Sequence, residues 1–312
     1  MWPNRWWVPA LCLAAIATAG CSRPAPGNRL EIAMVLKALD SEFWQRVKSG
    51  AEEAARADPT VRLAILAPRE EINIDQQVSI IEDQILKRVA ALAVAPGGVA
   101  ELLPVLDRAN AAGIPVVIFD SDLPWPPRRS FVGIDNKLGA RLAGEYVVRM
   151  LGGHGKVAII RGVLGVPTME DRVTGFQQGI AAATGIECVA VQPANSERAL
   201  GMGVMENLLT SHPDLKAVFG ANDQMALGAM EAIAARHLTG KIVLVGFDAT
   251  REALKAVQAG QMSATVAQDP ERIGRQTMEE AIKAARGQPT DKSVDTGTSL
   301  VTKENVTEYL RL

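Results

Sequence analysis

Two carboxylates follow one of the most apolar runs in the sequence. The run is VVIF at 116–119, and Asp120 and Asp122 come directly after it, with Ser121 between them. A carboxylate pair can perform general acid–base chemistry, as in glycoside hydrolysis, and it can also hold a metal ion or accept hydrogen bonds from a ligand. Because side chains alternate in direction along a strand, the two carboxylates should face different ways. This favours a hydrogen-bond acceptor or a turn cap over paired catalysis.

Polar side chains also follow the other apolar runs of the chain. Lys37 follows the first run, and the residues after later runs include Asn222, Asp248 and Gln268. In open parallel sheets, ligands bind outside the carboxyl ends of the strands. We therefore expect these groups to line one cleft that binds a small polar ligand.

Two adjacent aromatic residues, Phe43 and Trp44, lie shortly after Lys37 at the expected start of a helix. An aromatic face can pack against the apolar face of a sugar ring while nearby acceptors bind the sugar hydroxyls. Neighbouring side chains on a helix point about 100° apart. We therefore expect one of the two rings in the core and the other in the cleft.

Other kinds of chemistry lack their residues. The three histidines, His154, His212 and His237, have no ligand spacing among themselves or to Cys188, so no zinc site is predicted. The sequence has no nucleophile elbow, no P-loop and no glycine-rich dinucleotide motif after a strand. We therefore expect no metal, no cofactor and no catalytic residues.

The elements that must position these residues alternate between two periods. Short β-branched runs occur at 30–36, 61–66, 90–95 and 115–119, and helical patterns separate them at 42–56, 73–87 and 100–112. Strands that are apolar on both faces, with amphipathic helices between them, indicate a parallel sheet covered on both sides. The rhythm restarts with strands at 130–133, 156–160, 187–192, 217–220 and 242–247. The predicted fold is therefore α/β, with two doubly wound parallel-sheet lobes.

Composition limits the possible partners. The chain has 312 residues, of which 48% are hydrophobic, and its net charge is −2. A chain of this length suits one or two globular domains with substantial cores. Because no basic surplus exists to follow a phosphate backbone, nucleic acid is not an expected partner.

The N-terminal segment has the layout of an export signal. Residues 1–21 contain one early arginine, an apolar run that is too short to span a membrane, and small residues before Cys21. The sequence TAGC resembles the lipobox of bacterial lipoproteins, which would make Cys21 the lipidated first residue of the mature protein. A simple cleaved signal that leaves a soluble protein is the alternative. Residues 22–28, rich in proline and small residues, are predicted to form a tether.

Four longer segments bring a family into view. They are RVTGFQQGI, VMENLLTSHPDLKAVFGANDQMALGAM, LVGFDAT and SATVAQDPERIG, and they occur in this order in the sequence. From about Leu30 to Lys303 the chain resembles the ribose/galactose-type periplasmic sugar-binding proteins of bacterial ABC importers, which have the type I periplasmic binding protein fold. The resemblance implies a three-crossover hinge between a first lobe of residues 29–132 and 269–297 and a second lobe of residues 133–268 and 298–312.

The same resemblance implies roles for individual residues. It makes Arg172 a donor to sugar oxygens, Asn222 an amide contact, and Asp120 and Asp248 hydroxyl acceptors. It also implies stacking by Trp44 beside Phe43, and a hinge-side amide at Gln268. The two strand-end carboxylates would then be explained by a ligand's hydroxyl groups.

The departures from the family pattern are also informative. Ribose binders have arginine directly after the aspartate at position 120, whereas this chain has Ser121 and then Asp122. The position of the second stacking aromatic holds Asn195–Ser196, and a small polar position holds Lys37. Lys37 is expected either to replace the missing arginine and favour an anionic ligand, or to pair with Asp120 or Asp122.

The sequence-based hypothesis is a solute-binding component of a bacterial ABC sugar importer. It would be a monomer in the periplasm or cell envelope, anchored to the membrane through Cys21, with a monosaccharide or polyol as ligand and the membrane permease as partner. A subunit that presents its ligand to a sensor kinase or chemoreceptor would have the same cleft. A repressor-type regulator is disfavoured by the signal segment and by the missing helix-turn-helix, and a carbohydrate-processing enzyme would turn over its sugar.

Overall fold

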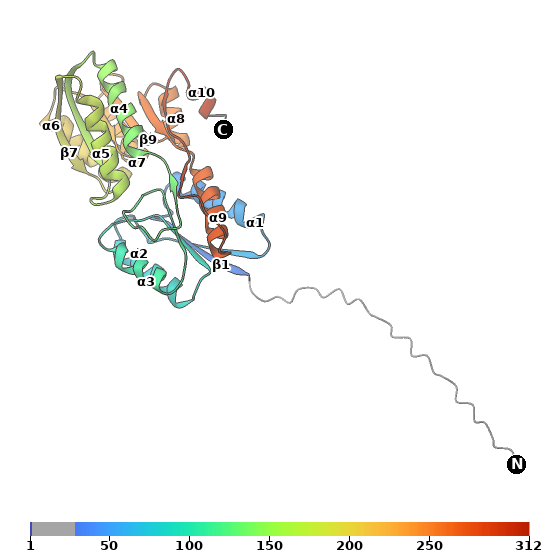
Figure 1. Cartoon of the computed structure of the whole chain (residues 1–312). Helices are drawn as coiled ribbons and strands as arrows, with labels where there is room; N and C mark the ends of the chain where they lie inside the picture. Colours follow the sequence, from blue (N-terminus) through green and yellow to red (C-terminus); the bar gives the residue numbers. More distant parts are fainter. Residues whose placement is uncertain (2–28, 312) are drawn as a thin grey trace.

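The computed structural model describes Met1 and residues 29–311, which form two lobes with one six-stranded sheet each (Figure 1). The first sheet has the strand order β11-β5-β4-β3-β1-β2, and all neighbouring strands in it are parallel. Its strands are β1 (Leu30–Val35), β2 (Val61–Leu66), β3 (Ala91–Val94), β4 (Val116–Phe119), β5 (Ser130–Gly133) and β11 (Ser293–Asp295).

The second sheet has the order β12-β10-β9-β8-β6-β7, and it is parallel except for the edge strand β12, which is antiparallel to β10. Its strands are β6 (His154–Arg161), β7 (Gly185–Pro193), β8 (Leu215–Gly220), β9 (Val243–Asp248), β10 (Ala264–Ala267) and β12 (Ser299–Thr302). The predicted fold class, two doubly wound parallel-sheet lobes, is confirmed.

Helices cover both faces of the first sheet. Ile32 and Met34 of β1 pack with α1 (Glu42–Arg56) and α9 (Pro270–Ala285). The alternate residues Ala33 and Val35 pack with α2 (Ile74–Leu86) and α3 (Leu102–Ala111) on the other face. Because the central strands β3 and β4 bury both of their faces, their sequences are apolar throughout instead of alternating.

The second lobe follows the same plan (Figure 1). Helices α4 and α5 pack together, as do α6 and α7, while the short helices α8 and α10 lie near β10 and β12. The rings of Phe176 in α5 and Phe219 in β8 stack in the core with centroids 4.6 Å apart. The bounds of the helices are α4 (Asn136–Met150), α5 (Pro167–Ile180), α6 (Arg198–Ser211), α7 (Asp223–Ala235), α8 (Arg251–Gln258) and α10 (Val306–Tyr309).

The chain passes between the two sheets three times. The passages connect β5 to α4, β10 to α9, and β11 to β12. They are tied to one another, because the backbone N–H of Thr296 donates to Gly133 O at 2.9 Å and the Thr298 hydroxyl donates to Ala267 O at 2.9 Å. The hinge is therefore a bundle of hydrogen-bonded segments.

Two glycines allow α1 and α9 to lie against each other in the first lobe. A Cβ atom on Gly50 would lie 1.9 Å from the carbonyl oxygen of Glu271, and a Cβ atom on Gly274 would lie 1.9 Å from that of Val47. Only glycine permits this approach, so these two residues set how closely α9 packs after the chain returns to the first lobe.

Two sequence predictions concern the membrane. The predicted signal segment at 1–21 beyond Met1, with its lipidation site Cys21, and the tether at 22–28 lie outside the described residues. Within residues 29–311, no helix is both long and apolar enough to cross a membrane.

Candidate ligand-binding site

A cavity lies between the two lobes. Its walls come from loops that follow β1, β2, β4, β6, β8 and β9 and from the helices that begin there. The lining residues are Lys37, Ser41, Phe43, Trp44, Glu71 and Asp120 from the first lobe, and Thr168, Met169, Arg172, Asn222, Gln224, Asp248 and Thr250 from the second.

Lys37 is buried in this cavity and is fully engaged by protein groups. Its Nζ donates to Asp120 Oδ2 at 2.7 Å, to Ser121 Oγ at 2.6 Å and to Thr168 Oγ1 at 3.2 Å. An ammonium group has three protons, so these three acceptors satisfy it. Of the two alternatives for Lys37, the structure therefore has the ion pair, and the partner is Asp120 rather than Asp122. Asp120 itself has a left-handed backbone with φ +61°.

Asp122 does not belong to this cavity, in contrast to the sequence prediction. Its side chain is 45% exposed and pairs with Arg128 Nη2 at 3.1 Å. Its Oδ1 accepts a hydrogen bond from the backbone N–H of Leu123 at 2.8 Å. The alternation along the strand end turns Asp120 inward and Asp122 toward the surface loop, where it stabilises a turn.

Both aromatic residues line the cavity, whereas only one was expected to face it. The rings of Phe43 and Trp44 meet edge to face, with centroids 4.9 Å apart and planes at 77°. The indole N–H of Trp44 donates to Glu71 Oε1 at 2.8 Å, and Ser41 caps the start of α1 through the backbone N–H of Trp44. The two rings also pack with the first-lobe core, so their positions are fixed from behind.

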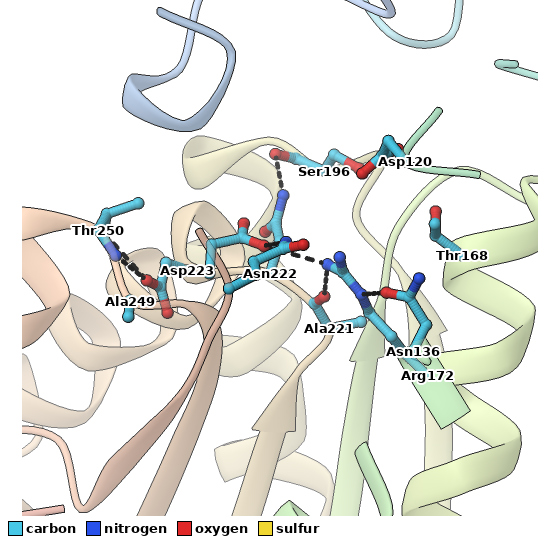
Figure 2. Close-up of polar contacts among 12 residues, drawn as sticks. Asp120, Asn136, Thr168, Arg172, Ser196, Ala221, Asn222, Asp223, Ala249 and Thr250 are labelled. Carbon is cyan, nitrogen blue, oxygen red and sulfur yellow. Dashed lines mark hydrogen bonds and ion pairs between the residues drawn. The ribbon is translucent and has the colours of Figure 1, made fainter. Parts of the chain in front are cut away.

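Arg172 is held by three groups of the second lobe (Figure 2). Its Nε donates to Asn136 Oδ1 at 2.9 Å, and its Nη1 donates to Ala221 O at 2.8 Å and to Asp248 Oδ1 at 3.4 Å. The guanidinium carbon also lies 3.7 Å from the ring centroid of Phe247. In Figure 2, Asp120 lies above Arg172 and Asn222, on the other side of the cavity.

Asp248 faces the cavity from a strained backbone position with φ +121°. Its Oδ1 accepts a hydrogen bond from Gln268 Nε2 at 2.7 Å. Burial raises the pKa of Asp248 to about 6, although the charge of Arg172 and the hydrogen bond from Gln268 both act to lower it. At neutral pH the group is therefore mostly an ionised acceptor.

The two predicted amide residues, Gln268 and Asn222, differ in their relation to the cavity. Gln268 is absent from the cavity lining among the described residues and touches Asp248 from the hinge side. Asn222 lines the cavity and also caps α7, because its Oδ1 accepts from the backbone N–H of Met225 at 2.9 Å. The Asn222 amide donates to the carbonyl of Ser196 at 3.2 Å.

Behind Asp248 lies a second buried carboxylate, Asp223. Its Oδ2 accepts from the backbone N–H of Thr250 at 2.7 Å and from the hydroxyl of the same residue at 3.1 Å, and its Oδ1 accepts from the Thr265 hydroxyl at 2.7 Å. Burial first, and then the charge of Asp248, raise the pKa of Asp223 to about 8. Asp223 thus holds the loop that presents Asp248.

Sequence reasoning missed several lining residues. Thr250 and Gln224 lie two positions after Asp248 and Asn222, so a wider window after each strand would have found them. Glu71 lies five residues after the end of β2, beyond any such window. The missed residues are Ser41, Glu71, Thr168, Met169, Gln224 and Thr250.

The described part of the chain contains no group of three or more His, Cys, Asp or Glu residues arranged to hold a metal ion. The cavity instead offers hydrogen-bond acceptors, one held guanidinium and two aromatic faces. This arrangement can bind a small polyhydroxylated molecule by hydrogen bonds and ring stacking.

Comparison with known proteins supports this chemistry. Residues 32–289 match the family model described as periplasmic binding protein domain. The ribose import binding protein of Escherichia coli is 33% identical over 275 residues, which cover 88% of this chain and 90% of that protein. The D-allose-binding periplasmic protein of the same organism is 35% identical and covers 84% of this chain and 88% of its own length.

A solved structure agrees with these relatives. An ABC transporter solute-binding protein from Agrobacterium vitis with bound D-fucose superposes with a TM-score of 0.87. It is 31% identical, and the match covers 90% of this chain and 98% of the other.

Proposed function

The chain belongs to the periplasmic binding protein family, and we propose that it is the solute-binding component of a bacterial ABC sugar importer. Its ligand is a monosaccharide or polyol that binds between the lobes. The observation that carries this proposal is a cavity that both lobes line with acceptors, a held arginine and two aromatic rings. The sugar-binding relatives and the D-fucose complex support it.

We assign the direct ligand contacts to six of the predicted residues. Phe43 and Trp44 stack on the ring, Asp120 and Asp248 accept from hydroxyls, and Arg172 and Asn222 complete the hydrogen bonds. Asn222 contributes an amide, a group that can both donate and accept hydrogen bonds. Asp248 and Arg172 already hold each other in position, so little ordering cost remains at binding.

Ligand contact with both lobes stabilises the closed form relative to open forms, because the open form loses one half of these contacts. The closed form is then the species that the membrane permease recognises. We propose that the protein binds its ligand without altering it, acts in the periplasm as a monomer, and is held at the membrane by a lipid on Cys21.

The test is a ligand screen followed by one matched pair of variants. Thermal-shift measurements on residues 29–312 with D-ribose, D-allose, D-fucose, D-galactose and myo-inositol should give a shift, since a ligand at about 100 times its dissociation constant stabilises by about 2.7 kcal/mol. Calorimetry then compares Asp248→Asn with Asp122→Asn. We expect the first variant to bind about tenfold more weakly, because it loses a charge-assisted hydrogen bond.

Asp122→Asn is the control, because it makes the same chemical change two residues from Asp120 but outside the cavity. It should bind like the wild type. Equal binding by both variants, or no shift with any sugar or polyol, would refute the proposed site.

A further inference from the structure

Glu71 lies at one corner of the cavity with only half of its carboxylate engaged. Its Oε1 accepts the indole N–H of Trp44 at 2.8 Å. Its Oε2 is buried and has no hydrogen-bond partner among residues 29–311. Burial of a carboxylate oxygen without a donor is costly. In a cavity that binds a ligand, the missing donor is expected to come from that ligand.

Neither cation of the cavity pairs with Glu71 in the structure. All three protons of Lys37 go to Asp120, Ser121 and Thr168. Arg172 belongs to the second lobe and is held by Asn136, Ala221 and Asp248. Glu71 therefore has no ion-pair partner among the described residues that line the cavity.

A count of the charged residues that line the cavity gives the same result. Three are carboxylates, Glu71, Asp120 and Asp248, and two are cations, Lys37 and Arg172. The charge of Glu71 reaches the second lobe, because it is one of the causes that raise the pKa of Asp248. A ligand with a negative group would add to this surplus, whereas a hydroxyl or ammonium group would relieve it.

We propose that Glu71 is a specificity-determining residue whose Oε2 accepts a hydrogen bond from an O–H or N–H group of the ligand. Its uncompensated charge makes the site select neutral or amine-bearing sugars over acidic ones. This inference rests on the proposed function and adds to it the class of ligand. It also implies that Lys37 neutralises Asp120 and does not attract an anion.

The test uses Glu71→Gln, which keeps the size of the side chain and an oxygen for Trp44 but removes the charge. Calorimetry, or competition against the best sugar of the screen, measures the dissociation constants of D-galactose, D-galactosamine and D-galacturonate. For the wild type we expect D-galacturonate to bind at least about tenfold more weakly than D-galactose. In Glu71→Gln the neutral sugar should bind about tenfold more weakly, as expected for loss of a charged acceptor. The acid-to-neutral ratio, which is the dissociation constant for D-galacturonate divided by that for D-galactose, should shrink by a similar factor.

The measurement with D-galactosamine identifies which ligand group donates to Glu71 Oε2. If the wild type binds D-galactosamine more tightly than D-galactose and Glu71→Gln loses this preference, the donor at Oε2 is an ammonium group. If both sugars bind equally well to the wild type and both weaken in the variant, the donor is a hydroxyl. Both results support the proposal.

Two further variants make the test specific. Glu70→Gln removes the neighbouring charge, which pairs with Arg69 at 3.6 Å outside the cavity, and should bind all three sugars like the wild type. Trp44→Phe keeps a ring but removes the indole N–H. If Glu71 acts only by holding Trp44, Glu71→Gln will have no further effect in the Trp44→Phe background. We expect the change in the acid-to-neutral ratio to persist there.

Three outcomes would overturn the assignment of Glu71. They are a Glu71→Gln variant that behaves like Glu70→Gln, a ratio that becomes insensitive to Glu71 once Trp44 is Phe, and a wild type that prefers the acid. If these occur while Asp248→Asn still weakens binding, only the role of Glu71 is refuted. If no sugar or polyol binds the wild type, the proposed function fails and the role of Glu71 fails with it.

Discussion

Asp223 and Asp248 are two carboxylates buried close to each other beside the cavity, and burial raises the pKa of both. Asp223 makes no contact with the cavity and is held by Thr250 and Thr265. Its pKa rises from 3.8 to about 8. Between these two pH values the folded protein holds a proton that the unfolded chain releases. The free energy of unfolding should therefore fall as pH rises through this window.

Asp223→Asn removes this titration and keeps the shape of the side chain. We expect the free energy of unfolding of the variant, minus that of the wild type, to increase from pH 5 to pH 8. One proton of difference gives a slope of roughly 1.4 kcal/mol per pH unit at most. Urea denaturation of both proteins at each pH measures this difference, in which all other groups cancel. A difference that does not change with pH would mean that Asp223 stays ionised, supported by its three hydrogen-bond donors.

At the residue scale, the sequence was most informative directly after the strands. The positions of Asp120, Asn222 and Asp248 follow from the rule that ligands bind at the carboxyl ends of parallel strands, and all three line the cavity. Glu71 and Thr168 could not be found in this way. Glu71 lies in the loop between β2 and α2, and Thr168 lies at the start of α5, and the local sequence pattern does not predict that either of them reaches the cavity. The partner of Lys37 was also open, since Asp120 and Asp122 differ only in the direction that the strand end gives them.

At the element scale, strand type was easier to predict than pairing across the chain. Runs such as Val116–Phe119 are apolar throughout, and only a sheet covered on both faces makes use of that pattern. The strand β11 (Ser293–Asp295) has three residues and shows no usable period. Its place beside β5 depends on the return of the chain through α9, which is a tertiary property.

The contact between α1 and α9 gives a prediction at this scale. A methyl group on Gly274 would meet the backbone oxygen of Val47 at 1.9 Å, so the two helices must separate in Gly274→Ala. We expect this overpacking to lower the free energy of unfolding by about 1–3 kcal/mol. Chemical denaturation measures the change.

Gly203→Ala is the matched control, because it is the same substitution inside α6 with no atom within 4 Å of the added methyl group. Alanine is the better helix former, so this variant should be equal to the wild type or more stable by up to about 1 kcal/mol. Equal stability of Gly274→Ala and Gly203→Ala would show that α9 can shift without cost.

At the scale of the whole molecule, the two lobes touch through a few polar contacts of the described residues. Thr168 of the second lobe receives hydrogen bonds from Lys37 and Ser121 of the first lobe, each at 3.2 Å. A second contact between the lobes joins Glu42 to α8: its carboxylate accepts from the backbone N–H of Arg251 at 2.9 and 3.1 Å. An acidic group at a helix N-terminus is favourable. Because these contacts join the two lobes, we expect them to contribute to closure together with the ligand.

Thr168→Val tests this contribution. It keeps the shape of a buried side chain and removes the hydroxyl that accepts hydrogen bonds from the first lobe. In the closed form one proton of Lys37 would then lack its acceptor, whereas in an open form water could hydrate it. A hydrogen bond to a charged group contributes about 1.5–3 kcal/mol, so the closed-to-open ratio without ligand should fall about tenfold or more. The radius of gyration of the ligand-free variant, measured by small-angle X-ray scattering, should exceed that of the ligand-free wild type. Sugar affinity should fall by the same factor as the closed fraction.

Thr210→Val, an exposed change in α6 that touches no first-lobe residue, should leave both quantities unchanged. If Thr168→Val gives the same scattering and affinity as Thr210→Val, closure does not depend on the Lys37–Thr168 contact and comes from the ligand and the hinge alone.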